Sequence, residues 1–562
     1  MLERILPATR WIKDYQRNDL YEDLNAGIIV FIMYVPQGVA YAMLAGLPPV
    51  MGLYAATIPV IMYALFASSK HLAVGPVALI SLLVLSGVST ISEPGTPEYI
   101  SYVILLSFMI GVIHFLLGIL KMGVLLNFLS HAVISGFISA AAIIIAFSQL
   151  KNVLGIEIEP SMYIYQVIME AAHNISSTNL YTLSIALGNI FALVLLKKYL
   201  PKFPTSIIVV IVTMLTVYWF NLDQQGVKIV GSVPNGMPSF LAPAFSLESI
   251  RILLPTALTI AFIAFMESIA IAKSIAAKEN YRIDVNQELK GVGLANIVGS
   301  FFSSYPITGS FTRSAVNYQS GAKTPLASIF TAFFLIITLL FFTQFFYYLP
   351  HATLSAIILV AVYKLVDFKE AKHIFQLKKA DGWILVVTFV STLIIGLELG
   401  ILVGIIFSLI TVLHRTANPD PFIVELGYIE QKDVFQNINR IPDGKTYSET
   451  VILRIDSSLY FANISHLEKK LEELIQQRKN IKSLIFDMSG VNSIDSEAVH
   501  RFEDILRDLR DKNGIHFEFT HMKYSVREII TKSKWDTKFG LPISYQSLKE
   551  VLTRQGLMKN TG

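Results

Sequence analysis

Long apolar runs constrain the fold of this chain more than any other feature of its sequence. Runs that can cross the roughly 30 Å hydrocarbon core of a bilayer recur from about Leu24 to about Leu413. The whole chain of 562 residues is 53% hydrophobic and only 15% charged. That composition is too apolar for a soluble domain of this length. We therefore predict an α-helical polytopic membrane protein.

We predict fourteen transmembrane segments along these runs. They span residues 24–45, 49–67, 72–89, 99–120, 124–149, 179–196, 204–220, 251–275, 288–302, 310–319, 325–348, 351–365, 381–397 and 399–414. Four of them, 72–89, 288–302, 310–319 and 351–365, are short and contain Gly, Pro, Ser and Thr. Such segments suit half-helices that end near the bilayer midplane, where protein or a water-filled cavity must surround the exposed backbone.

The distribution of Lys and Arg between the segments predicts the orientation. Cytoplasmic loops are enriched in these residues, and alternate loops carry them here if the N-terminus is cytoplasmic, most densely at 364–379. The opposite loops are nearly free of cations, and Lys151 and Lys228 are the exceptions. Since fourteen segments return the chain to its starting side, we expect both termini in the cytoplasm and the protein in the cell membrane.

The sequence changes character after residue 415, where short strand-like segments alternate with charged amphipathic helices. This pattern is typical of a soluble α/β domain. We divide the chain into a cytoplasmic N-terminal segment, 1–23, a membrane domain, 24–415, and a cytoplasmic C-terminal domain, 416–562. In the last domain we predict strands at 451–455, at 516–522 and ending at Asp487, and helices at 466–480, at 523–535 and from 493–496 to a C-cap at Gly514.

Two parts of the membrane domain carry related chemistry in the same order. The segment 35–50 (VPQGVAYAMLAGLPPV) precedes 71–83 (HLAVGPVALISLL), and 265–276 (FMESIAIAKSIA) precedes 307–317 (ITGSFTRSAVN). Because seven is odd, a second set of seven segments enters the membrane from the opposite side. We therefore predict two inverted repeats, at about 24–220 and 251–415, with a site near the midplane where they meet.

The openings of the third and tenth segments predict two helix starts at that site. Pro76 suits the first helical position, because its fixed φ fits a helix and its missing N–H would be unpaired there. Ser310 or Thr312 can cap the second start, beside Gly309. Two helix N-termini that meet would each contribute about half a positive charge. The alternative for Gly75-Pro76 is a simple kink.

Arg313 adds a full cation to this place, within GSFTRSAVNYQSGAKTP at 309–325. A cation at membrane depth is costly, so it usually faces a cavity and meets an anion or a carboxylate. The guanidinium fork also matches oxyanion geometry. These features predict that the chain moves anions. The alternatives are an arginine that reaches the interface, or one paired with an acid for stability alone.

Glu267 is the second ionisable residue within the predicted membrane segments that bears on this site. Burial and a nearby bound anion both favour protonation of a carboxyl group, so Glu267 could couple anion movement to proton movement. Two alternatives remain: a permanent ion pair with Arg313 or Lys273, or a contribution to sodium binding, since carboxylates also suit a hard cation.

Gln37 and Tyr41 lie four residues apart and so share one helix face, where both can donate hydrogen bonds to the same point. Taken alone, this pair is weak evidence, because both residues have ordinary roles in membrane helices. The sequence also lacks the motifs that mark several classes of enzyme and metal-binding protein. The chain has no cysteine, and it lacks a P-loop, a metal-ligand spacing and a nucleophile constellation. We expect no enzyme activity, no cofactor, no metal and no nucleic-acid partner.

Five motifs together closely resemble the SulP sulfate permeases, the anion transporters that include pendrin and prestin. They are VPQGVAYAMLAGLPPVMGLY, HLAVGPVALISLL, ESIAIAKSIA, VNQELKGVGLANIVGSFF and GSFTRSAVNYQSGAKTP. In the tail, IKSLIFDMSGVNSIDSEAV is similar to the STAS domain, named for sulfate transporters and anti-sigma factor antagonists. The resemblance implies fourteen segments in two inverted repeats, divided into core and gate parts, a cytoplasmic STAS domain and a homodimer.

The resemblance also implies which residues bind the anion. By motif, the family site falls on Gln37 and Tyr41, on Pro76, Val77 and Ala78, and on Thr312 and Arg313. Relatives often carry Ser in place of Thr312 and an aromatic residue in place of Val77, which leaves the substrate open. Glu267 lies where proton-coupled members also carry an acid.

We therefore expect a secondary active, proton-coupled anion symporter with sulfate as the favoured substrate, working by rocking or elevator-like motion. Rival expectations are bicarbonate or dicarboxylate transport coupled to protons or sodium, an exchanger, an anion channel, a voltage-responsive protein, or a membrane anchor for the STAS domain. A cytoplasmic regulator is a possible STAS partner.

Overall fold

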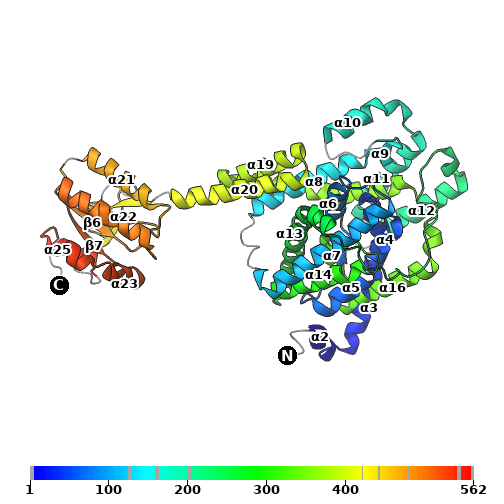
Figure 1. The fold of residues 1–562 in the computed structure, drawn as a ribbon, viewed down its shortest axis with the longest axis horizontal. Helices are drawn as coiled ribbons and strands as arrows, with labels where there is room; N and C mark the ends of the chain where they lie inside the picture. The colour runs from blue at the N-terminus through cyan, green and yellow to red at the C-terminus, as the bar shows by residue number, and fades with distance from the viewer. Residues whose placement is uncertain are drawn as a thin grey trace. The chain divides into compact units, whose positions relative to one another are not determined.

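The computed structural model describes residues 6–123, 130–158, 164–199, 205–419, 422–440, 444–478, 480–540 and 546–558. Two compact units divide the chain, Met1–Ser408 and Leu409–Gly562 (Figure 1). The predicted domain border at residues 415 and 416 falls inside helix α20 (Leu397–Ala417), which crosses from one unit into the other.

The first unit is helical. Its first half contains α2 (Ala8–Lys13), α3 (Arg17–Leu44), α4 (Pro49–Tyr54), α5 (Ile58–Phe66), α6 (Ala78–Val88), α7 (Pro97–Ile119), α8 (His131–Ser148), α9 (Leu150–Leu154), α10 (Ile164–His173), α11 (Leu180–Tyr199) and α12 (Thr205–Phe220). Its second half contains α13 (Leu247–Lys278), α14 (Val285–Ser300), α15 (Phe311–Gln319), α16 (Leu326–Phe341), α17 (His351–Val362), α18 (Phe368–Leu377), α19 (Lys379–Ile395) and α20.

Each predicted membrane segment overlaps one of these helices, except that the second is split into α4 and α5. Residues 124–129, at the start of the fifth predicted segment, lie outside the described part. Within the described residues, seven helices or joined helix pairs are long and apolar enough to cross a membrane, and four shorter apolar helices accompany them. The predicted helical membrane fold is confirmed, while the number of crossings stays a prediction.

Three of the four segments expected to be half-helices are short. Helices α6, α15 and α17 have 11, 9 and 12 residues, too few to cross a bilayer at 1.5 Å per residue. Helix α14 is longer, with 16 residues. Its glycines do not shorten it, because they serve close packing: a Cβ on Gly293 would press on the backbone of α7 at Phe115.

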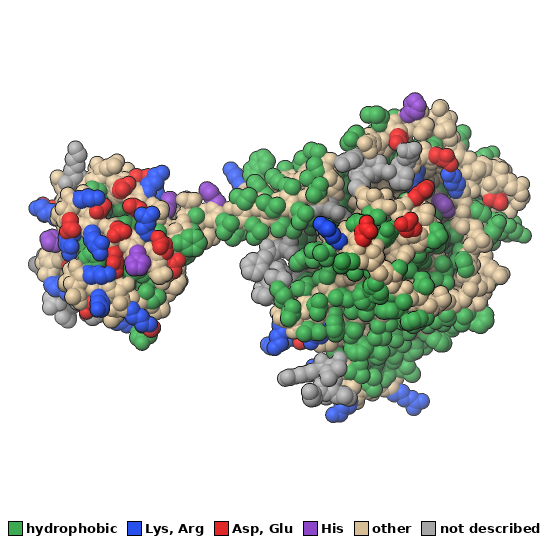
Figure 2. Space-filling view, in the orientation of Figure 1, with side chains coloured by type: hydrophobic (Ala, Val, Ile, Leu, Met, Phe, Trp, Pro, Cys, Tyr) green, Lys and Arg blue, Asp and Glu red, His purple; other side chains and the backbone are tan. Residues whose placement is uncertain are grey.

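The helices of the first unit can be divided into two groups, which also pack against each other where α17 meets α3 and α8 meets α6. One group contains α3, α5, α6, α7, α13, α14, α15 and α16, and the other contains α8, α11, α12, α17 and α19. Both groups contain helices from both predicted repeats. The division into core and gate stays a prediction. Hydrophobic side chains cover much of the surface of this unit (Figure 2), with Trp219 and Phe341 among the most exposed, as lipid-facing surfaces require.

Two short buried strands cross near the middle of the first group. Strand β1 (Val74–Gly75) pairs antiparallel with β2 (Thr308–Gly309), so Val74 faces Gly309 and Gly75 faces Thr308. Helix α3 supports one side, where the Tyr34 hydroxyl donates to the Val74 carbonyl at 2.6 Å. Helix α13 supports the other, where Ser268 Oγ accepts from the Gly309 amide at 2.8 Å. Extended backbone at membrane depth thus finds its hydrogen bonds within the protein.

The second unit is a mixed sheet with helices. Strands β3 (Ile423–Ile429), β4 (Val434–Asn437), β5 (Thr450–Ile455), β6 (Ser483–Asp487) and β7 (His516–Thr520) lie in the order β4-β3-β5-β6-β7, with β5, β6 and β7 parallel. Its helices are α21 (Ile464–Gln477), α22 (Ser496–Arg507), α23 (Tyr524–Lys532), α24 (Trp535–Phe539) and α25 (Leu548–Arg554). The three predicted strands and three predicted helices are all present. A turn of π-helix, Asp508–Lys512, separates α22 from Gly514 and was not predicted.

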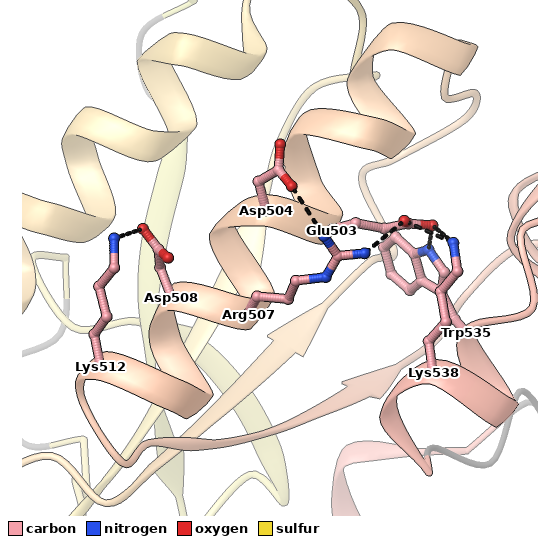
Figure 3. Close-up of polar contacts among 7 residues, drawn as sticks. All are labelled: Glu503, Asp504, Arg507, Asp508, Lys512, Trp535 and Lys538. Atoms are coloured by element: carbon pink, nitrogen blue, oxygen red, sulfur yellow. Dashed lines mark hydrogen bonds and ion pairs between the residues drawn. The ribbon is translucent and has the colours of Figure 1, made fainter.

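Glu503 is a buried carboxylate within this second unit, on α22 (Figure 3). It accepts a hydrogen bond from Trp535 Nε1 at 2.8 Å, and Lys538 Nζ donates to both of its oxygens at 2.9 and 2.8 Å. Arg507 approaches it at 3.9 Å. A buried charge is tolerated when hydrogen bonds and opposite charges surround it. Glu503 therefore fastens α24 to α22.

Replacing Glu503 with Ala should destabilise the second unit by about 2 kcal/mol, because Trp535 Nε1 would stay buried without an acceptor. The measurement is the urea concentration at which this unit becomes sensitive to protease in the purified full chain. Asp504→Ala is the matched control, since its side chain is 65% exposed on the same helix. We expect that control to shift stability by less than about 0.5 kcal/mol, and equal midpoints for the two variants would contradict the assignment.

Replacing Gly75 with Ala should disrupt the strand crossing. A Cβ there would overlap the buried hydroxyl of Tyr34, and the φ of Gly75, +152°, disfavours other residues. Forced overpacking typically costs about 1–3 kcal/mol, so the thermal unfolding midpoint of the detergent-purified protein should fall. Gly188→Ala, on α11, is the control, since its Cβ would meet nothing within 4 Å. An unchanged midpoint for Gly75→Ala would show that the crossing tolerates a side chain.

Candidate anion-binding site

The strand crossing brings the starts of α6 and α15 together. The prediction that Pro76 is the first helical residue is wrong: α6 begins at Ala78, and its N-cap is Val77, with extended backbone at φ −136° and ψ 150°. The physical reason is the pairing of Val74 and Gly75 with β2, which keeps the chain extended up to the helix. Pro76 instead presents its carbonyl to the site.

The two helix starts differ in capping. Val77 has no side-chain oxygen, and the first amide of α6 with a backbone partner is that of Ser81, which donates to the Val77 carbonyl at 3.0 Å. The preceding N–H groups of the helix have no acceptor among the described residues. At α15, Ser310 is the N-cap, and its hydroxyl accepts from the Arg313 amide at 3.5 Å. Of the two candidates, Ser310 is therefore the cap, and Thr312 lies half-buried in the first turn.

Arg313 is completely buried and contacts three neutral groups. Its Nη1 donates to Gln37 Oε1 at 3.1 Å, and its Nη2 donates to the Pro76 carbonyl at 2.7 Å. The guanidinium carbon lies 4.3 Å from the centre of the Tyr34 ring, a cation–π contact. None of these partners carries a negative charge, so they orient the guanidinium without neutralising it.

Gln37 and Tyr41 lie together on α3, both almost fully buried. Because Gln37 Oε1 accepts from Arg313, its amide nitrogen is left as a donor. Neither that nitrogen nor the Tyr41 hydroxyl has a hydrogen-bond partner among the described residues. Both groups are therefore available to donate to a ligand.

Glu267 lies on α13, next to Ser268, which supports β2. Its Oε2 is buried without a hydrogen-bond partner in the described part of the chain. No direct ion pair joins Glu267 to Arg313 or Lys273 among the described residues, although Arg313 is close enough to act on it electrostatically. The alternative of a permanent ion pair is thus not seen, and the carboxyl group is held near a cation with one oxygen free.

The structure brings the predicted residues into one neighbourhood. Arg313 contacts Gln37 and Pro76 directly, Pro76 leads into Val77 and Ala78, and Thr312 precedes Arg313 on α15. Tyr41 lies within electrostatic range of both Arg313 and Glu267. Whether these residues hold an anion stays a prediction.

Tyr34 was missed by the sequence reasoning, although it supports both Arg313 and β1. A signal for it was present. Tyr34, Gln37 and Tyr41 follow each other at spacings of three and four, which places them on one face of a helix. As for metals, no group of three or more His, Cys, Asp or Glu side chains gathers within the described residues.

The sequence matches two known protein families. The sulfate permease family profile matches residues 20–388, and the STAS domain profile matches residues 442–550. Sulfate transporter 4.1, chloroplastic, of Arabidopsis thaliana is 39% identical over 535 residues, which cover 91% of this chain and 77% of that protein. Probable sulfate transporter 4.2 of the same plant is 38% identical over 529 residues, covering 91% of this chain and 78% of the relative.

Solved structures agree in fold. The overall structure of SLC26A9 matches with a TM-score of 0.88 at 25% identity, covering 99% of this chain and 93% of the other. The murine Solute Carrier 26 family member A9 anion transporter in the inward-facing state matches with a TM-score of 0.89 at 25% identity, covering 98% and 94%. The transmembrane domain of the cyanobacterial bicarbonate transporter BicA shares the fold, with a TM-score of 0.61 at 20% identity over 70% of this chain and 98% of that domain. From these matches, and from the helical unit and mixed-sheet domain that they cover, the chain belongs to the sulfate permease family and ends in a STAS domain.

Proposed function

We propose that this protein is a secondary active anion transporter, that sulfate is its substrate and that it couples anion entry to protons. The sulfate assignment is supported by relatives that are named sulfate transporters at 39% and 38% identity. The coupling and the site are inferred from the charges around the strand crossing.

The observation that carries the proposal is the buried guanidinium of Arg313, held by neutral partners beside an uncapped helix start. The unpaired N–H groups of α6 and the dipole of that helix favour an anion there. The Gln37 amide and the Tyr41 hydroxyl add donors, and Thr312 adds a hydroxyl. Arg313 is fully buried, so it stabilises the anion mainly through its field across a medium of low polarity.

Glu267 is the residue that we propose couples proton movement to anion movement. Its buried Oε2 has no hydrogen-bond partner among the described residues, and the Arg313 cation lies within electrostatic range. A bound anion offsets that cation and repels the carboxylate, so anion and proton bind together. A pH difference of one unit is worth about 1.4 kcal/mol per proton, which can drive about tenfold accumulation of the anion for one proton carried.

The unpartnered carboxylate also leaves sodium open as the coupling ion, since hard cations prefer oxygen ligands. Bicarbonate and dicarboxylates remain alternative substrates, because uncapped N–H groups and a guanidinium suit any small oxyanion. Exchange, channel-like conduction and a membrane-anchor role are the remaining rivals.

The remaining parts of the proposal concern assembly and motion. The first group of helices would move as the core against the second group, the gate, in a homodimer placed in the cell membrane. The N-terminus and the STAS domain would lie in the cytoplasm, as the Lys and Arg distribution predicts, and the STAS domain would bind a cytoplasmic regulator.

Arg313→Ala should weaken sulfate binding at least about tenfold, because it removes the buried cation whose field holds the anion, and two unit charges near a protein site attract each other by a few kcal/mol. The measurement is equilibrium binding of labelled sulfate to purified protein, with the unfolding midpoint as a check on folding. Arg313→Lys keeps the charge and should bind with intermediate affinity. Arg251→Ala, an exposed arginine on α13, should bind like the original chain. Full affinity in Arg313→Ala would remove the proposed site.

Glu267→Gln should still bind sulfate but lose pH-driven accumulation, because the amide carries no proton between the two sides. Uptake of labelled sulfate into proteoliposomes under an imposed pH gradient, and separately under a sodium gradient, tests this. Glu248→Gln, an exposed acid at the start of the same helix, is the matched control. Undiminished accumulation by the Glu267 variant would exclude this residue as the coupling group. If the original chain accumulates sulfate under a sodium gradient and not under a pH gradient, sodium is the coupling ion.

A further inference from the structure

A cavity of about 260 Å³ opens one helical turn beyond the proposed site. On α3 it is lined by Ala40 and Leu44, and Ala40 lies three residues after Gln37. On α6 it is lined by Leu82 and Ser86, and Leu82 lies four residues after Ala78. Helices α8 and α17 of the second helix group also line it, for example with Ile144 and Leu354. The cavity therefore lies between the two groups, next to the proposed anion site.

Lys151 is the only Lys, Arg, Asp or Glu among the described residues that line this cavity. It belongs to α9, and among those described residues its ammonium group makes no hydrogen bond and no ion pair. The other polar lining groups are uncharged side chains, such as Asn152 and Ser89, together with His351. Among the described lining residues there is one unpaired ammonium and no carboxylate, so these residues give the chamber a positive potential.

A second, larger cavity of about 820 Å³ shares Lys151, Asn152, Ile158 and His351 with the first. Its charges are mixed. Lys228 Nζ lies 3.2 Å from Glu157, and Glu170 also lines it. Lys151 thus lies where the two cavities join, between a chamber with both signs of charge and one without acids among its described residues.

The position of Lys151 also accounts for a feature of the sequence. Lys151 and Lys228 are the two cations on loops that are otherwise depleted of Lys and Arg. The fold gathers both at the same cavity. The backbone joins Lys228 to the start of α17, since the His351 amide donates to the Lys228 carbonyl at 3.0 Å. Only one of the two, Lys228, has an acidic partner among the described residues.

We propose that Lys151 forms a second, transient binding station for small inorganic oxyanions, on the path between the larger cavity and the site at Arg313. The inference rests on the proposed transport function. The station attracts the anion through the single ammonium charge and leaves it hydrated, since the surrounding amides and hydroxyls suit water-mediated contacts. Occupancy there raises the anion concentration beside the Arg313 site without adding affinity to that site.

The absence of cysteine from the chain permits a sharp test, because Lys151→Cys introduces a single thiol. In proteoliposomes, this variant should raise the KM for sulfate presented on the Lys151 side by about tenfold, while the KM from the opposite side stays unchanged. Reaction with 2-aminoethyl methanethiosulfonate restores an ammonium group and should restore the KM. Reaction with 2-sulfonatoethyl methanethiosulfonate adds a negative charge and should raise the KM further.

Two controls and a binding readout complete the experiment. The original chain has no thiol and should ignore both reagents. Lys228→Cys, whose lysine is already paired with Glu157, should change the KM much less. Sulfate should slow modification of the Lys151→Cys thiol by the sulfonatoethyl reagent, more than gluconate does at equal ionic strength.

The outcomes separate this inference from the proposed function. If the original chain moves no anion but sulfate still protects the thiol, transport fails as the function and the binding station stands. If the original chain transports sulfate while neither reagent changes the KM and sulfate gives no protection, the station is wrong and transport stands. A KM raised equally from both sides would also overturn the station, because a general folding defect explains it.

Discussion

The antiparallel pairing of Val74–Gly75 with Thr308–Gly309 is the interaction on which the rest of the membrane unit depends. Backbone that leaves a helix inside a bilayer must find hydrogen bonds within the protein. The pairing, Tyr34 and Ser268 together supply them here. The same pairing joins two parts of the chain that lie far apart in sequence. It fixes where α6 and α15 begin, and so where their dipoles and Arg313 lie.

The charged side chains beside the paired strands β1 and β2 make no ion pair with each other among the described residues. Arg313 is oriented by an amide, a carbonyl and an aromatic ring, all of them neutral. Glu267 keeps one oxygen unpartnered nearby. A cation whose contacts are neutral can attract a mobile anion, whereas one locked into an ion pair cannot. The proposed station at Lys151 would attract anions for the same reason, since that lysine has no acidic partner among the described residues.

Much of the architecture was predictable because it depends on local pattern. Apolar length predicted the membrane helices, and alternation of short strands and amphipathic helices predicted the parallel strands β5, β6 and β7 with three of their helices. Strands β3 and β4 and helix α25 were not predicted. They lie at the edge and on the other face of the sheet, where Leu548 and Val551 pack against Val424, so their fold depends on partners distant in sequence.

The sequence alone determined the class of protein, the candidate residues and their approximate order, because hydrophobic length and motif chemistry are properties of the chain itself. Tertiary structure decided which groups meet. Arg313 takes its partners from residues more than 230 positions away, Gln37 and Pro76. Tyr34 reaches Val74 across forty positions. Pro76 precedes α6 and is not its first residue, because strand β2 from the other half of the membrane domain holds the backbone extended there. No local sequence pattern encodes that contact.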